Sequence, residues 1–101
     1  FTDPTEGRED EYNDWYNNVH LGEVLNTDGF VRAQRFKVAD TMPGVTDHGY
    51  VAIYELETDD PGAAMKALTG ASAGFTMTDA ANLKNAKMSL ATQASDLVES
   101  A

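Results

Sequence analysis

Two stretches of the chain alternate apolar and polar residues with the period of a helix. In the first stretch the apolar positions share one helical face: Tyr12, Trp15, Tyr16 and Val19. Acidic residues at positions 9–11 favour a helix N-terminus there, and Gly22 is a suitable stop. The pattern predicts one amphipathic helix over about residues 8–20, with His20 in its last turn.

The second helical stretch begins at Asp60 and Pro61. This pair is typical of a helix N-terminus, because the carboxylate accepts hydrogen bonds from free backbone N–H groups and proline lacks such a group. Residues rich in alanine, methionine and leucine continue to about Leu68, and Gly70 follows as a suitable stop. The pattern predicts a second helix that ends just before Gly70.

Three further stretches have the pattern of β-strands, in which successive side chains point to opposite faces. Residues 29–38 alternate in this way. Four of them are expected to share one face: Phe30, Arg32, Gln34 and Phe36. Residues 50–56 are apolar on nearly both faces and predict a strand that is covered on each side. Residues 87–92 alternate as well and predict a last strand.

The segments between these stretches predict connections and one further strand. A loop rich in Pro, Gly and Asp runs through Met42-Pro43-Gly44. Residues 71–78 predict a loop, and residues 79–84 predict a short helical turn. Phe1 and Thr2 are expected to be the tail of a first strand whose remainder is missing from the sequence.

With that first strand, the predicted order is β-α-β-β-α-β, which is the ferredoxin-like split β-α-β arrangement of the α+β class. It has an antiparallel sheet with two helices on one face. We expect one domain over residues 1–92 and a flexible tail over residues 93–101. The other face of the sheet also needs cover, and in a short chain a second copy supplies it. Two such sheets, packed face to face, form a dimeric α+β barrel, so a homodimer is predicted.

Composition narrows the classes of partner. The formal net charge is -10, which argues against nucleic acid, because its phosphates are bound mainly by lysine and arginine. The same charge argues against an anionic membrane surface, and no apolar run approaches the roughly 20 residues that span a bilayer. The chain has no cysteine, so disulfides and thiolate chemistry are excluded. We expect a cytoplasmic protein that acts on a small molecule.

The chain resembles a known family in three of these segments. Residues 15–21, Trp-Tyr-Asn-Asn-Val-His-Leu, resemble the helix-end signature of EthD-like dimeric α+β barrel proteins. Residues 29–36 and 50–56 resemble the second and third strands of that family. The resemblance covers about residues 1–92, but Gly22 stands where the family usually has proline. It implies the barrel fold. Relatives in the wider superfamily include polyketide cyclases, muconolactone isomerases, decarboxylases and members without established activity, so the reaction type stays open.

Two histidines are candidates for catalysis. The imidazole of His20 titrates near neutral pH and can act as a general acid or base, and a helix C-terminus would stabilise its protonated form. His48 lies just before the strand at 50–56, where Asp47 could orient it. The alternatives are a helix cap for His20 and a solvent-exposed loop histidine for His48. The resemblance favours a functional His20, because the matching family histidine lies near the barrel pocket.

Aromatic and polar side chains are candidates to hold a substrate. Tyr16, His48 or Tyr50 is expected to polarise or hold a substrate oxygen. The residues expected to line the pocket are Trp15, Tyr16, Arg32, Gln34 and Tyr54. Aromatic residues at helical spacing are also explained by packing against a sheet alone. Charged residues within a buried strand, such as Arg32 and Arg35, must be paired or bind a ligand. A salt bridge is one explanation, and an arginine on the pocket face could instead bind a carboxylate or enolate with two hydrogen bonds. Alternation does not show which face of the strand points inward.

These residues favour a small cofactor-independent enzyme of the lyase, isomerase or cyclase type. His20 would transfer a proton on a small hydrophobic or aromatic metabolite. Phosphate-binding loops, dinucleotide fingerprints and serine nucleophile motifs are not visible, and two distant histidines make a poor metal site, so no cofactor or metal is expected. Two alternatives remain open: a non-catalytic ligand-binding or accessory protein, and a cofactor-free monooxygenase.

Overall fold

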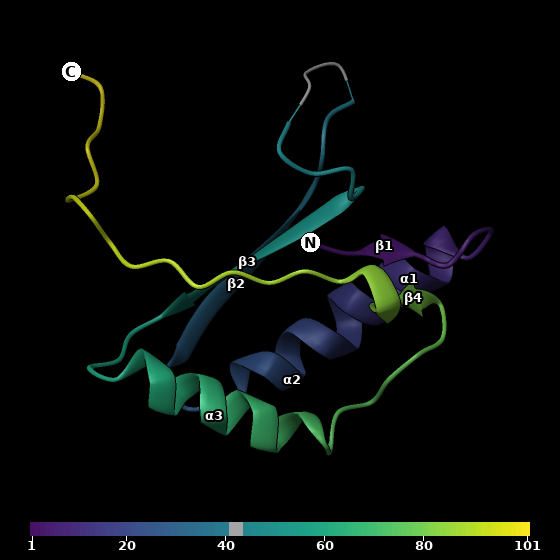
Figure 1. Cartoon of the computed structure of the whole chain (residues 1–101), viewed down its shortest axis with the longest axis horizontal. Helices are drawn as coiled ribbons and strands as arrows, with labels where there is room; N and C mark the ends of the chain where they lie inside the picture. Colours follow the sequence, from purple (N-terminus) through teal and green to yellow (C-terminus); the bar gives the residue numbers. More distant parts are fainter. Residues whose placement is uncertain (41–43) are drawn as a thin grey trace.

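The computed structural model describes residues 1–40 and 44–101, so Met42 and Pro43 of the predicted loop lie outside the described residues. The architecture is α+β, with helices and small antiparallel sheets (Figure 1). The elements are β1 (Asp3–Pro4), α1 (Glu9–Trp15), the π-helix η1 (Tyr16–His20), α2 (Leu21–Leu25), β2 (Phe30–Lys37), β3 (Tyr50–Leu56), α3 (Pro61–Ser72), β4 (Ala81–Asn82) and the 3₁₀ turn η2 (Leu83–Asn85). Among the described helices, none is long and apolar enough to cross a membrane.

The strands form two antiparallel pairs that are joined by one bridge. β2 pairs with β3, and the short β1 pairs with β4. Thr2 forms an antiparallel bridge with Tyr50 at the start of β3. Two backbone hydrogen bonds, of 3.0 and 3.2 Å, hold this bridge. The strands therefore follow one another in space as β4, β1, β3 and β2, and each neighbouring pair is antiparallel.

A β-bulge at the start of β2 changes which side chains share a face. Phe30 pairs with Leu56, but the register shifts before Arg32, which pairs with Glu55. The extra residue, Val31, turns Phe30 to the side opposite Arg32. Phe30 is 7% exposed, whereas Phe36 is 43% exposed. The predicted grouping of Phe30 with the other three residues of that face is therefore wrong.

The first helical segment runs five residues further than its pattern predicts. α1, η1 and α2 follow one another without a break from Glu9 to Leu25. Gly22 lies inside α2, where a glycine is tolerated at a cost of about 1 kcal/mol relative to alanine. Val24 is only 4% exposed, and its burial favours continuation of the helix beyond Gly22. The turn into β2 is made instead by Gly29, with φ of 92°.

The second helix begins as predicted. The Asp60 side chain accepts a 3.0 Å hydrogen bond from the backbone N–H of Ala63, and Pro61 occupies the first helical position. The helix passes through Gly70 and ends at Ser72, so the predicted end is three or four residues early. Hydrogen bonds from the hydroxyls of Thr69 and Ser72 to preceding carbonyls support this last turn.

The last strand is not where alternation predicts it. β4 occupies Ala81–Asn82, and residues 86–101 are irregular and exposed. Lys87 nevertheless exchanges two backbone hydrogen bonds with Phe1, of 2.7 and 2.9 Å. A strand needs a partner along its whole length, so alternation at Met88 and Leu90 does not create one. The tail over residues 93–101 extends away from the body (Figure 1).

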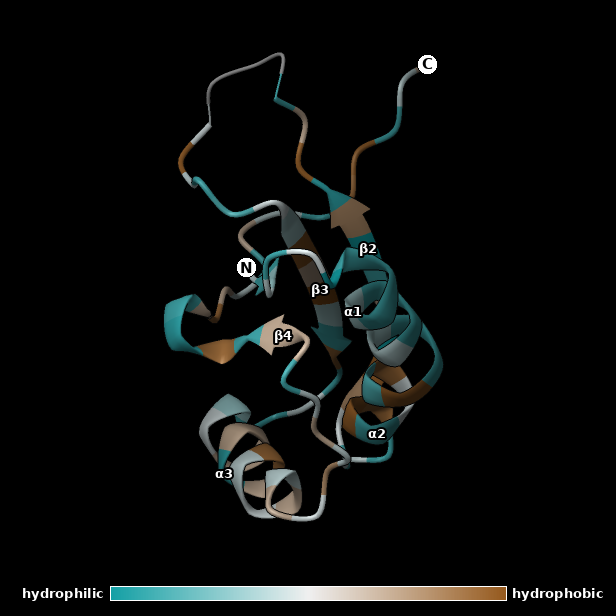
Figure 2. Cartoon of the chain, turned by 90° about the vertical axis from the view of Figure 1, so that its right-hand side faces the viewer, coloured by the Kyte–Doolittle hydropathy of each residue, from teal (hydrophilic) through white to brown (hydrophobic). Residues whose placement is uncertain are grey.

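Two clusters of buried side chains lie between the helices and one face of β2 and β3. The first is aromatic and joins the first helical segment to β3 and β4: Tyr12, Trp15, Tyr16, Tyr50, Ala80 and Ala81. The second joins α2, β2 and α3: Val24, Phe30 and Ala64. Figure 2 shows hydrophobic residues gathered in α2, whereas α1 is largely hydrophilic on the side in view. Both helical segments therefore cover the same face of the β2–β3 pair.

Candidate functional site

His20 lies in an aromatic enclosure at the end of the π-helix. Its imidazole stacks on the indole of Trp15, with the ring centroids 4.6 Å apart and the planes at 20°. Tyr16 and Phe75 meet it edge-on, at 4.9 and 5.8 Å. Phe75 comes from the loop that follows α3. Three aromatic rings therefore surround this histidine.

The π-helix accounts for the stacking of Trp15 on His20. These residues are five positions apart, and in an α-helix such residues do not share a face. A π-helix closes its hydrogen bonds over five residues, as the bond from Leu21 N–H to the Tyr16 carbonyl does here. This wider turn brings the two rings together. Single π-turns inside α-helices are frequent at functional sites.

The hydrogen-bonding capacity of the His20 imidazole is poorly satisfied. Its Nδ1 atom is buried and has no hydrogen-bond partner among the described residues. Burial lowers the pKa of His20, and the nearby carboxylate of Glu23 only partly opposes that effect. His20 lies within a continuous helix, so the expected stabilisation of its protonated form by a helix C-terminus is wrong. Burial thus favours the neutral form of this imidazole, and its Nδ1 atom is open to a ligand.

Trp15 and Glu23 fix the loop that covers His20. The indole N–H of Trp15 donates a 2.7 Å hydrogen bond to the carbonyl of Thr76. The backbone N–H of Thr76 in turn donates to both carboxylate oxygens of Glu23, at 2.9 and 3.0 Å. These bonds hold Phe75, the neighbour of Thr76, against the imidazole. Trp15 thus lines the enclosure around His20 and also holds the loop that covers it.

Tyr16 connects His20 to the sheet. Its hydroxyl accepts a 3.4 Å hydrogen bond from the hydroxyl of Tyr54 on β3. Burial, followed by the proximity of Tyr16, raises the pKa of Tyr54 well above its ordinary value. Burial therefore favours the neutral form of Tyr54, whose hydroxyl donates to Tyr16. The structure brings together three residues that the sequence predicts for one site: His20, Tyr16 and Tyr54.

Tyr50 lies in the same aromatic cluster but has polar partners at its far end. Its hydroxyl donates a 2.6 Å hydrogen bond to Glu9 and accepts a 3.2 Å bond from the side chain of Asn13. Its ring centroid lies 5.2 Å from that of Tyr12. Tyr50 is thus tied to α1 by its hydroxyl.

Arg35, a charged strand residue whose face the sequence left open, belongs to this cluster. Its guanidinium lies 4.3 Å from the ring centre of Tyr16, and 5.1 Å from those of Tyr12 and Tyr50. It pairs in register with Ala52 on the helix-facing side of the sheet. The sequence shows a charged residue in a strand, but alternation cannot assign its face. The aromatic residues of the neighbouring helix were the sequence feature that could have indicated the face on which Arg35 lies.

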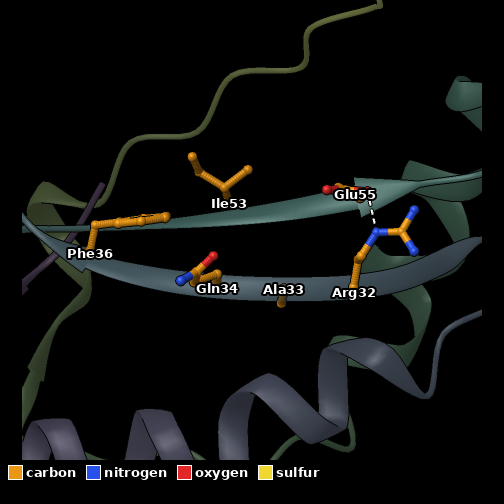
Figure 3. A pocket seen from close by; sticks show the side chains of 6 residues that line it. All are labelled: Arg32, Ala33, Gln34, Phe36, Ile53 and Glu55. Atoms are coloured by element: carbon orange, nitrogen blue, oxygen red, sulfur yellow. Dashed lines mark hydrogen bonds and ion pairs between the residues drawn. The ribbon is translucent and has the colours of Figure 1, made fainter. Parts of the chain in front are cut away.

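Arg32 and Gln34 lie on the opposite face of the sheet, away from His20 (Figure 3). Arg32 forms ion pairs with Glu55 and Glu57. The exposed face defined by Arg32, Gln34, Phe36, Ile53 and Glu55, here called the outer face, carries a shallow hollow of about 260 Å³. Figure 3 shows these side chains pointing away from the helices, whereas Ala33 points toward them. The structure therefore separates these two residues from the histidine.

His48 lies at another end of the molecule. Its Nδ1 atom is hydrogen bonded to the Thr46 hydroxyl, and its Nε2 atom to the carbonyl of Asn85, each at 2.5 Å. The nearest described aromatic ring is that of Phe1, 6.0 Å away. Both ring nitrogens are occupied, so His48 connects two loops in this structure.

The residues of the predicted site thus divide into three locations. Five of them share the aromatic region between helix and sheet: Trp15, Tyr16, His20, Tyr50 and Tyr54. Arg32 and Gln34 lie on the outer face, and His48 lies between loops. Within the described residues, no three histidine or acidic side chains gather as they would around a metal ion.

Comparisons with known proteins add no assignment. No protein-family model matches the chain, and no match was found among curated proteins or among solved structures.

Proposed function

We propose that this chain is a small cofactor-independent enzyme of the lyase, isomerase or cyclase type. His20 would transfer a proton on a small hydrophobic or aromatic metabolite. The observation that carries the proposal is the buried Nδ1 atom of His20, which has no described partner and faces aromatic walls. A neutral imidazole is the form that accepts a proton.

The surrounding residues suit the removal of a proton from carbon. When a proton leaves a carbon next to a carbonyl group, negative charge develops on the carbonyl oxygen, and hydrogen-bond donors stabilise it. The hydroxyl of Tyr16, which accepts the hydrogen bond of Tyr54, is such a donor, and Tyr16 contacts His20 directly. In this proposal His20 takes the proton, Tyr16 holds the oxygen, and the proton returns at a second position or a leaving group departs.

A substrate needs access to the imidazole. The space between the helix and the sheet is filled by aromatic side chains, and Phe75 covers His20 from the loop after α3. Phe75 lies in a loop, where its own backbone N–H donates to the Ser72 carbonyl and its neighbour Thr76 is bonded to Trp15 and Glu23. We place the entry at this loop, whose outward movement would expose the imidazole edge.

Deuterium exchange tests the proposal without knowledge of the complete reaction. The protein is incubated in D₂O with a panel of small phenols, keto acids and unsaturated acids, and loss of each C–H signal is followed by NMR. We expect exchange at one carbon of at least one compound. His20→Gln should slow it by about 100-fold or more, which is the lower range for general acid–base catalysis.

A matched variant controls for damage to the helix. Asn18 lies in the same π-helix, is exposed and bonds only to Asp14 among the described residues, so Asn18→Ala should leave exchange unchanged. Rapid exchange by a folded His20→Gln protein would contradict the mechanism. Saturable binding of a compound with no exchange in any protein would favour the ligand-binding alternative, and consumption of oxygen would favour the monooxygenase alternative.

The proposal includes a fold and an assembly. The strand order β4, β1, β3, β2, with both helical segments on one face, supports a ferredoxin-like domain, as in the EthD-like proteins that the sequence resembles. The outer face leaves Phe36 and Ile53 43% and 54% exposed. We propose that a second copy covers this face, so that two sheets form a dimeric α+β barrel.

A further inference from the structure

Arg35 differs from the other two arginines of the chain in its partners. Arg8 forms ion pairs with Glu11 and Asp79, and Arg32 forms ion pairs with Glu55 and Glu57. For Arg35, no carboxylate of the described residues lies within the 4.0 Å of an ion pair, although the chain has 17 acidic residues. The one arginine on the helix-facing side of the sheet thus has no described charged partner.

The partners that Arg35 does have are neutral. Its two Nη atoms donate to the side-chain oxygens of Asn17 and Asn13, at 2.7 and 2.9 Å. Three tyrosine rings surround the guanidinium, and such contacts hold a cation in place without neutralising it. Its Nε atom is buried without a described partner. Arg35 therefore carries a fixed positive charge with unused capacity for hydrogen bonds.

We propose that Arg35 binds the acidic end of the substrate, so that the site takes a small aromatic carboxylate. This inference rests on the proposed function, because it names the substrate class of the same site. The planar guanidinium matches the two oxygens of a carboxylate and can bind both in parallel, whereas each asparagine offers it a single uncharged oxygen. A carboxylate would therefore displace an asparagine oxygen.

The position of Asn17 and Tyr16 supports this assignment. Asn17 is exposed on the π-helix, so its side chain can leave the guanidinium without disturbing the buried cluster. Tyr16 contacts the guanidinium with its ring face and meets His20 edge-on. A substrate ring that lies along Tyr16 would have its carboxylate at Arg35 and its reacting carbon toward His20.

Titration of the ¹⁵N-labelled protein with benzoate tests the inference directly. The three arginines give three Nε–H signals, which are assigned with single Arg→Lys variants. We expect benzoate to shift the Arg35 signal in a saturable manner and to leave those of Arg8 and Arg32 in place. Benzamide, which has the same shape without the charge, should shift none of them.

Two variants provide the affinity comparison. Arg35→Gln should weaken benzoate binding by about tenfold or more, as expected for loss of a charge-assisted pair. Arg32→Gln removes an arginine of the same strand from the outer face and should leave the affinity unchanged. If Arg35→Gln does not fold, as judged by circular dichroism, the titration of the wild-type protein decides alone.

Several outcomes would overturn the inference. An Arg35 signal that ignores benzoate, equal shifts of all three arginine signals, or an equal response to benzamide would each do so. The proposed function fails by a different result, which is rapid C–H exchange in His20→Gln. His20→Gln should still bind benzoate through Arg35, so the titration and the exchange experiment report on the two ideas separately.

Discussion

The imidazole of His20 is held by aromatic rings rather than by hydrogen bonds. Trp15 stacks on it, Tyr16 and Phe75 meet its edges, and its Nδ1 atom has no described partner. A buried polar atom without a partner costs about 1–3 kcal/mol. A ligand that bonds to this nitrogen would recover that energy, which is a reason to expect one.

The stability of the protein should report the burial of His20. Because burial lowers its pKa below the ordinary 6.5, the folded protein binds this proton less readily than the unfolded chain does. The free energy of unfolding should therefore fall as the pH decreases from about 6.5 through the lowered pKa. Urea unfolding at pH 7.5 and 5.5 measures this loss.

His20→Gln provides the comparison for that experiment. The carboxylates and His48 are common to both proteins, so the difference between them isolates His20. We expect the variant to lose less stability than the wild-type protein between the two pH values. Equal losses would mean that His20 titrates in the folded protein as it does in the unfolded chain.

At the residue scale, the sequence identified the aromatic residues around His20 but could not decide which arginine lies on the same face as them. Helical spacing places Trp15, Tyr16 and His20 near one another, because they lie within two turns of one segment. The face on which Arg32 or Arg35 lies depends on the bulge at Val31, which comes from tertiary pairing with β3. Such a shift leaves no mark in the alternation itself.

At the scale of elements, the first helical segment is one run of three parts, and Gly22 is inside it. Glycine predicts a helix end because it adopts positive φ easily. Here Gly22 has no positive φ, whereas Gly29 has φ of 92°. The two glycines therefore have opposite roles, which can be separated by adding a methyl group to each.

Gly22→Ala should stabilise the protein by about 0.5–1 kcal/mol, because alanine is the better residue inside a helix. A methyl group there meets no atom within 4 Å. Gly29→Ala, the matched change, should destabilise by about 1–2 kcal/mol, because its φ disfavours any side chain. Urea unfolding checks both. A less stable Gly22→Ala protein would mean that the helix ends at Gly22.

The elements that the sequence predicts well are those with local causes. Asp60 and Pro61 start α3 by bonds within its first turn. The strands predicted at residues 29–38 and 50–56 are confirmed as β2 and β3. Both are rich in residues that favour strands, and each has its partner strand nearby in the sequence. The prediction of a strand at residues 87–92 was wrong. A strand there would need a partner from a distant part of the chain, and local alternation does not supply one.

At the scale of the whole molecule, the outer face is the surface that a second copy would cover in the proposed dimer. Phe36 and Ile53 are exposed to solvent on this face, next to the ion pair between Arg32 and Glu55. Apolar side chains gathered on one face commonly mark an interaction surface. The proposed dimer would cover it with the same residues from a second copy, in an interface with twofold symmetry.

Light scattering at micromolar concentration tests this assembly. We expect a mass near twice the 10.9 kDa of one chain. Ile53→Lys places a charge at the centre of the outer face, opposite Gln34, and should give the mass of one chain. Ala67→Lys, on the exposed side of α3, is the control and should leave the dimer intact. A wild-type mass near 10.9 kDa would exclude the barrel.

The stacking of Trp15 on His20 has a practical consequence. Trp15 is the only tryptophan of the chain, so all of its indole fluorescence originates at this site. Protonation of a stacked imidazole quenches an indole, and a ligand that separates the rings would relieve contact quenching. The protein therefore carries its own optical reporter. Its emission can follow the charge of His20, the opening of the loop at Phe75 and the arrival of a substrate, without any label.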